Sequence, residues 1–78
     1  MTPETTLWRS VIAQAILDAT NRANSAAERL ARVNARKWLT ENTPGFRAVC
    51  EAADVPAFRV LNNARRLEAA GWPQERRL

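Results

Sequence analysis

Apolar residues recur at three- and four-residue intervals through the first part of the chain: Leu7, Trp8, Val11, Ile12, Ala15, Ile16 and Ala19. This spacing places the side chains on one broad face of an α-helix and does not fit the two-residue alternation of a half-buried strand. Thr2 can cap this helix and Pro3 suits its first position, so we expect a helix over about residues 3–22. The solvent side of the helix should carry Arg9, Gln14, Asp18 and Arg22.

A second helix should begin after Ser25 and run to about Thr40. Ser25 and Glu28 have the spacing of a capping box, in which the Ser25 hydroxyl accepts from the Glu28 amide and Glu28 reaches back to the Ser25 amide. The buried side of this helix is expected to come from Leu30, Val33 or Asn34, Trp38 and Leu39. Pro44 should stop helical propagation.

Two further helices are predicted over about residues 46–53 and 57–70, with Gly71 as a left-handed cap of the last one. Tyr is absent and β-branched residues do not alternate, so the fold class is all-α. At 78 residues the chain fits a single four-helix domain, residues 1–78. The tail 72–78 is expected to be disordered, although Trp72 either packs back onto the core, which we favour, or stays exposed as an anchor for a partner.

The stretch 49–60, VCEAADVPAFRV, has the packing pattern of a helix-turn-helix over about residues 46–70. Such a motif needs a small residue where its two helices cross, which here is Cys50. Asp54 occupies the turn in a left-handed conformation that Asp tolerates, and Val55 and Val60 supply the apolar contacts. Pro56 stands where a capping side chain is usual, and the Asp54 carboxylate is expected to accept from the Ala57 amide instead.

The helix after this turn has a polar outer face that matches the chemistry of base recognition. The candidate base contacts are Arg59, Asn62, Asn63 and Arg66. Asn binds adenine and Arg binds guanine with paired hydrogen bonds in the major groove. The candidate phosphate contacts are Arg47, Arg65, Arg76 and Arg77. Alternatively, the pair Asn62-Asn63 marks a break in the helix, which would remove the recognition surface.

Phe58 follows the turn by a few positions and should lie near the surface, against a thymine methyl group, a partner subunit or the first helix.

The net charge is +4, and eleven of the twelve basic residues are Arg. Nucleic acid is therefore the favoured partner, because Arg pairs with phosphate and guanine through two parallel bonds. The stripe Arg29, Arg32 and Arg36 with Lys37 is interpreted as a solvated helix face rather than a second nucleic-acid surface.

The sequence favours a non-enzymatic protein with no cofactor and no metal site. There is no His, no Gly-rich phosphate loop and no nucleophile motif. Cys50 is the single cysteine and is expected to be a buried packing residue. Neither a signal peptide nor a membrane span is recognisable, so a cytoplasmic, nucleoid-associated location is expected.

Three groups of residues together resemble a known family. They are Trp8, Ile12, Ala15-Ile16 and Asp18-Ala19; Ala35 with Trp38-Leu39; and Phe46, Val49-Cys50-Glu51, Ala53 and Val55. Over about residues 7–60 the chain resembles small helical proteins of prophages and gene-transfer-agent clusters in proteobacteria. The resemblance implies a DNA-binding regulator with a helix-turn-helix similar to those of Trp repressor and the DnaA C-terminal domain. The family usually has Ala-Gly-Leu-Asp-Pro at the turn, where this chain has residues 53–57, ADVPA.

These observations predict a transcriptional regulator of phage-like genes that binds double-stranded DNA through the major groove, with a homodimer as the usual state of such modules. Two alternatives stay open. One is an adaptor that docks on RNA polymerase or a host enzyme, and the other is a small terminase-like component of DNA packaging.

Overall fold

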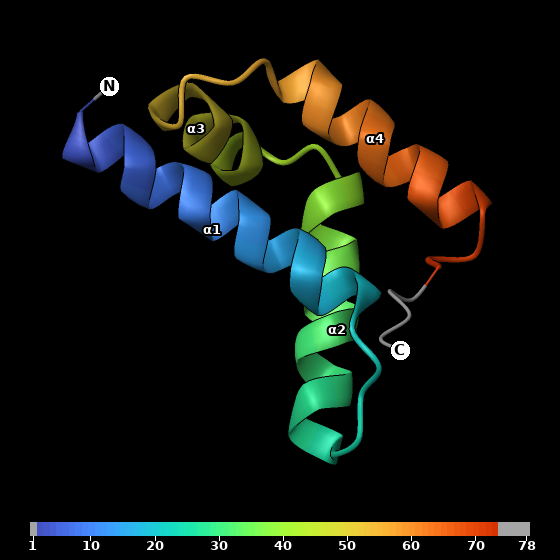
Figure 1. The fold of residues 1–78 in the computed structure, drawn as a ribbon. Helices are drawn as coiled ribbons and strands as arrows, with labels where there is room; N and C mark the ends of the chain where they lie inside the picture. Colours follow the sequence, from blue (N-terminus) through green and yellow to red (C-terminus); the bar gives the residue numbers. More distant parts are fainter. Residues whose placement is uncertain (1, 74–78) are drawn as a thin grey trace.

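The computed structural model describes residues 2–73 as four helices joined by short connections (Figure 1). They are α1 (Pro3–Thr20), α2 (Ala26–Thr40), α3 (Pro44–Ala52) and α4 (Ala57–Ala69). The all-α class is therefore confirmed. α1 packs most extensively on α2 and also contacts α3, while α4 contacts both α2 and α3.

α1 begins as predicted and ends two residues early. The Thr2 hydroxyl accepts a hydrogen bond from the Thr5 amide at 3.1 Å, and Pro3 is the first helical residue. Asn21 already has an extended backbone, with ψ at 146°. The prediction of a helix to residue 22 was wrong because the apolar pattern that holds α1 against its neighbours stops at Ala19.

The cap of α2 is half of the predicted box. The Ser25 hydroxyl accepts from the Glu28 amide at 3.1 Å, as expected. The Glu28 carboxylate, however, accepts from the amide of Asn24 at 2.7 Å rather than from that of Ser25. Both bonds still satisfy amide groups at the helix start, which is the physical purpose of such a cap.

α3 starts two residues earlier than predicted. Pro44 does not merely end α2; it is the first residue of α3, and the Thr43 hydroxyl accepts from the Phe46 amide at 3.2 Å. Proline is suited to this position because the first amides of a helix have no partner within it.

The core lies where the second half of α2 meets the other three helices. Its fully buried large side chains are those of Leu39, Phe46 and Cys50. The rings of Trp38 and Phe46 meet edge to face, with centroids 5.0 Å apart and an angle of 74°. Such aromatic pairs add about 0.5–1.5 kcal/mol beyond the burial of their surface.

The predicted buried side of α2 is correct for Leu39 and for Trp38, which packs against the core, and wrong for its first turns. Leu30 and Val33 are exposed, and the buried residues of this helix are Ala35 and Leu39. The first turns of α2 project beyond the crossing with α1, so no other helix covers them (Figure 1).

The apolar face assigned to α1 is likewise only partly buried. Ile12 and Ala19 are buried, whereas Leu7 and Val11 remain exposed. The face is wider than the surface that α2 and α3 cover.

Trp72 folds back onto the core and is only 8% exposed. Gly71 has a positive φ of 81°, the Trp72 amide donates to the Leu67 carbonyl at 2.7 Å, and the Gly71 amide donates to that of Glu68 at 2.9 Å. This is the two-bond Schellman arrangement that ends many helices. The favoured prediction that Trp72 packs back onto the core is thus confirmed, and the tail is not disordered at that residue; residues 74–78 lie outside the described part.

Within residues 2–73, none of the helices combines the length and the apolar character that a membrane crossing requires.

Candidate nucleic-acid interface

The turn between α3 and α4 is a second Schellman arrangement, built on Asp54. Asp54 has a φ of 56°, in the left-handed region. The Val55 amide donates to the Cys50 carbonyl and the Asp54 amide donates to that of Glu51, both at 3.0 Å. The predicted left-handed Asp54 is therefore present, and the two bonds fix the direction in which the chain leaves α3.

Arg9 of α1 donates hydrogen bonds to the backbone of this turn. Its Nε donates to the Ala53 carbonyl at 2.8 Å, and an Nη atom lies 3.5 Å from the Asp54 carbonyl oxygen. The assignment of Arg9 to the solvent side was wrong. A signal was available, because Arg9 precedes Ile12 by three residues and Ile16 by seven, a spacing that places all three on neighbouring parts of one helix face.

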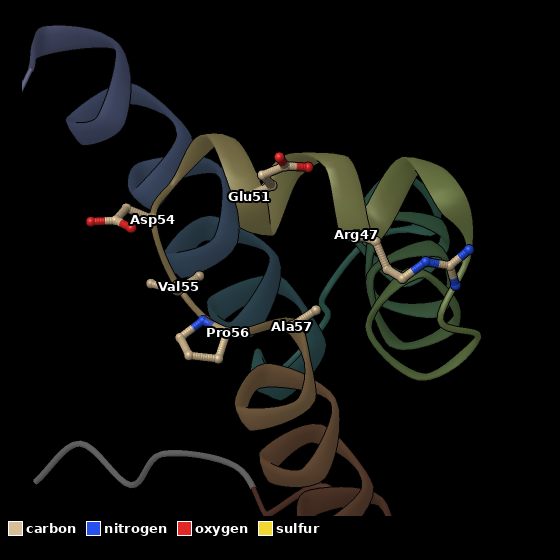
Figure 2. Close-up of a pocket in the computed structure, with 6 residues that line it drawn as sticks. All are labelled: Arg47, Glu51, Asp54, Val55, Pro56 and Ala57. Atoms are coloured by element: carbon tan, nitrogen blue, oxygen red, sulfur yellow. The ribbon is translucent and has the colours of Figure 1, made fainter.

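The start of α4 has no side-chain cap. Pro56 occupies the capping position, and no side chain accepts a hydrogen bond there. The predicted bond from the Ala57 amide to the Asp54 carboxylate is not formed, and that carboxylate points away from Ala57 (Figure 2). A left-handed Asp54 directs its side chain outward, so the backbone conformation that makes the turn also removes the cap.

A shallow depression of about 380 Å³ lies over this turn (Figure 2). It is lined by Arg47, Glu51, Asp54, Val55, Pro56 and Ala57. The lining mixes one basic with two acidic side chains. Arg47 is exposed and donates to the Asn42 carbonyl, which orients its guanidinium at the beginning of α3.

α4 is one unbroken helix through Asn62 and Asn63. The alternative of a break at these residues is therefore wrong. Core contacts on the opposite side of α4, with Leu61 and Ala64 buried, hold the helix although Asn is a poor helix former.

The four candidate base-contact residues all lie on the exposed side of α4: Arg59, Asn62, Asn63 and Arg66. Each residue turns a helix by roughly 100°, so these four fall within an arc of about 100°. None of their side chains is needed to fill the core.

The flanks of this surface are also exposed. Arg65 lies beside it, and Phe58 near the helix start is 63% exposed. Phe58 was predicted to lie near the surface, which is confirmed, but it was not among the candidate base or phosphate contacts. Because it adjoins Arg59, it belongs to the same outer surface of α4. Arg76 and Arg77 lie outside the described residues.

The Arg stripe of α2 is only partly the solvated face that was predicted. Arg29 is exposed, but Arg36 is half-buried, its Nε donates to the Ala19 carbonyl at 2.8 Å, and its guanidinium lies 5.2 Å from the centre of the Trp72 ring. Burial and, secondarily, the charge of Arg32 lower the pKa of Arg36. Arg36 is therefore a structural link between α1, α2 and the segment after α4.

Cys50 lies inside the crossing of α3 and α4 and is fully buried. Burial raises the pKa of its thiol, which disfavours the reactive thiolate. In the described part of the chain, no three His, Cys, Asp or Glu side chains are grouped so as to hold a metal ion.

No family model, curated protein or solved structure matches the chain.

Proposed function

We propose that the chain binds double-stranded DNA through the outer face of α4 and regulates transcription. The observation that carries this proposal is the unbroken α4 with Arg59, Asn62, Asn63 and Arg66 on one exposed arc. A helix of this kind fits the major groove, where Arg and Asn recognise guanine and adenine edges.

The inner side of α4 supports the same interpretation. Leu61 and Ala64 are buried and Ala57, Val60 and Leu67 pack against the core, so the helix is held firmly from behind. The turn before it is fixed by two backbone hydrogen bonds and by Arg9. A recognition surface gains precision from such a rigid support. We therefore interpret α3, the turn and α4 as a helix-turn-helix.

Phosphate contacts would come from both sides of α4. Arg65 lies on one flank of the recognition face, and Arg47 lies at the start of α3 beside the depression. The start of α4 itself has no side-chain cap, and the free amides of a helix start attract anions. The carboxylates of Glu51 and Asp54 line the same depression and repel phosphate. A bound phosphate should therefore lie closer to Arg47 than to the turn between α3 and α4.

The genes under control are proposed to be phage-like, on the basis of the sequence resemblance over about residues 7–60. Activation of late or packaging genes is the form of regulation that this resemblance suggests. Recovery of bound DNA from cells and its sequencing would identify the targets, and their absence from phage-like loci would argue against this part of the proposal.

The first experiment is fluorescence anisotropy with a labelled random-sequence duplex over a series of salt concentrations. Binding should weaken steeply as salt rises, since phosphate contacts release condensed counterions. Arg65→Gln should reduce the slope of log K against log salt by about 1. Arg29→Gln removes the same charge from the exposed surface of α2 and should leave this slope unchanged.

The second experiment tests base recognition. DNA should be selected from a random library with the wild type and with Arg66→Gln. The variant should lose about 1–3 kcal/mol of discrimination at one base position while still binding non-specific duplex. The absence of any binding to duplex at low salt would overturn the proposal, and the protein-binding adaptor would then become the better interpretation.

A further inference from the structure

A second depression, an open groove of about 740 Å³, lies between α1 and α2. The lining residues are Leu7, Ser10, Val11, Gln14, Ala15, Asp18, Ala31, Asn34, Ala35 and Trp38. All of them belong to α1 and α2, and none belongs to α3 or α4. The groove is therefore separate from the candidate nucleic-acid interface.

The groove is nearly without charge. Asp18 is the single charged lining residue, and one of its carboxylate oxygens accepts from Gln14 Nε2 at 2.9 Å. None of the lining residues is basic, although the chain has twelve basic residues and a net charge of +4. Two copies of so basic a chain repel one another over most approaches, and this face lets them meet without opposing Arg side chains.

The groove has large apolar side chains on its α1 wall and small ones on its α2 wall. Leu7 and Val11 stand one helical turn apart on α1 and remain exposed. Across the groove, Ala31 and Ala35 are small and leave room at the same spacing on α2. A two-fold axis brings each protruding pair against the other copy's small residues, because an isologous contact uses the same patch on both subunits.

The length of α1 and the area that a stable dimer buries describe the contact that is needed. α1 has 18 residues and so spans about 27 Å at 1.5 Å per residue. A specific interface buries about 800 Å² per partner, which is about one seventh of the 5678 Å² of accessible surface. A dimer of this kind must bury an area of this order, from the groove linings together with the exposed sides of α1.

We infer that the chain forms a homodimer in which α1 of each copy lies in the α1–α2 groove of the other. This inference does not depend on DNA binding. If α4 binds DNA, the dimer leaves both α4 helices uncovered, as binding to paired half-sites requires.

The test is sedimentation equilibrium of the full chain, without DNA, from micromolar to millimolar concentration. The wild type should behave as a dimer at the upper end of this range. Leu7→Glu should weaken the dimer by more than about a hundredfold, because it places a carboxylate in an apolar interface. Val33→Glu is the matched control: Leu7 is 60% exposed and Val33 is 56% exposed, and Val33 does not line the groove but lies on the opposite side of α2 from the lining residues. This control should dimerise like the wild type.

A second groove variant, Ala31→Glu, should weaken the dimer as Leu7→Glu does, and it distinguishes a loss of dimerisation from a folding defect at Leu7. Ala31→Glu also places a carboxylate in the groove, at an exposed position of α2 where Glu is a good helix former. Circular dichroism should show wild-type helicity for all three variants. Wild type that stays monomeric throughout the range would overturn the inference, and this is also the result expected if the groove binds a helix of another protein. Equal weakening of the dimer by Leu7→Glu and Val33→Glu would overturn it as well. A dimer that fails to bind duplex would leave the inference intact and remove the proposed function, and a DNA-binding monomer would do the reverse.

Discussion

The Nε of Arg9, in the first helix, donates a hydrogen bond of 2.8 Å to the carbonyl of Ala53, at the end of the third. This bond joins residues 44 positions apart in the sequence and fastens the turn that aims α4. A buried or half-buried carbonyl without a partner costs about 1–3 kcal/mol, so the contact affects both stability and the placement of the proposed recognition helix.

Arg9→Met should therefore lower the free energy of unfolding by about 1–3 kcal/mol, since Met retains the aliphatic part of the side chain and removes the donors. Urea denaturation followed by circular dichroism measures this change. Arg22→Met removes the same charge from an exposed residue beyond α1 and should change stability by less than about 0.5 kcal/mol. Equal effects of the two substitutions would show that the bond to Ala53 contributes nothing.

Asp54→Gly should raise the free energy of unfolding by about 0.5 kcal/mol. Asp54 has a φ of 56°, and glycine adopts this region without the steric cost that a β-carbon imposes. Asp54→Ala is the matched substitution and should lower stability by about 1 kcal/mol, because Ala has a β-carbon and tolerates the left-handed region less well than Asp does. A stabilising Ala variant would contradict the account of the turn.

Arg36→Met should destabilise the protein by about 1–2 kcal/mol, through loss of the bond to the Ala19 carbonyl and of the contact with the Trp72 ring. The tryptophan fluorescence of the folded state should change as well. Arg29→Met, at an exposed position of the same helix, should do neither. A silent Arg36 variant would mean that Trp72 is held by apolar packing alone.

The Cys50 thiol should react with a thiol reagent at least about a hundredfold more slowly in the folded protein than in urea, because it is buried and its pKa is raised. Because the pKa of the Cys50 thiol is higher in the folded state than in the unfolded state, the buried thiol contributes its full stabilisation below the ordinary thiol pKa. This stabilisation is lost as pH rises through the pKa of the folded state. Cys50→Ala should therefore remove part of the loss of stability at alkaline pH. Rapid labelling of the folded protein would contradict this burial.

The number and order of the helices follow from local signals, whereas the extent of each buried face does not. Three- and four-residue apolar spacing and the Ser25 cap depend on neighbours in the sequence, so they identified α1 and α2. The exposure of Leu30 depends on the point at which α1 crosses α2. Tertiary packing sets this point, and the apolar periodicity of α2 does not indicate it.

The candidate site shows the same division. Exposure of Arg59, Asn62, Asn63 and Arg66 could be predicted from the apolar positions on the opposite side of α4. The bond from Arg9 to Ala53 and the groove between α1 and α2 could not, because each arises from two helices brought together only by the tertiary fold.

An NMR titration of ¹⁵N-labelled protein with a random-sequence duplex at low salt tests most directly the claim that the outer face of α4 contacts DNA. Non-specific binding is sufficient for this measurement, since phosphate contacts supply most of it. The largest amide shifts and the strongest broadening should occur at residues 58–66 and at Arg47, with little change around Leu30 and Val33. Saturable binding with shifts confined to α1 and α2, or no shifts at all, would contradict the claim.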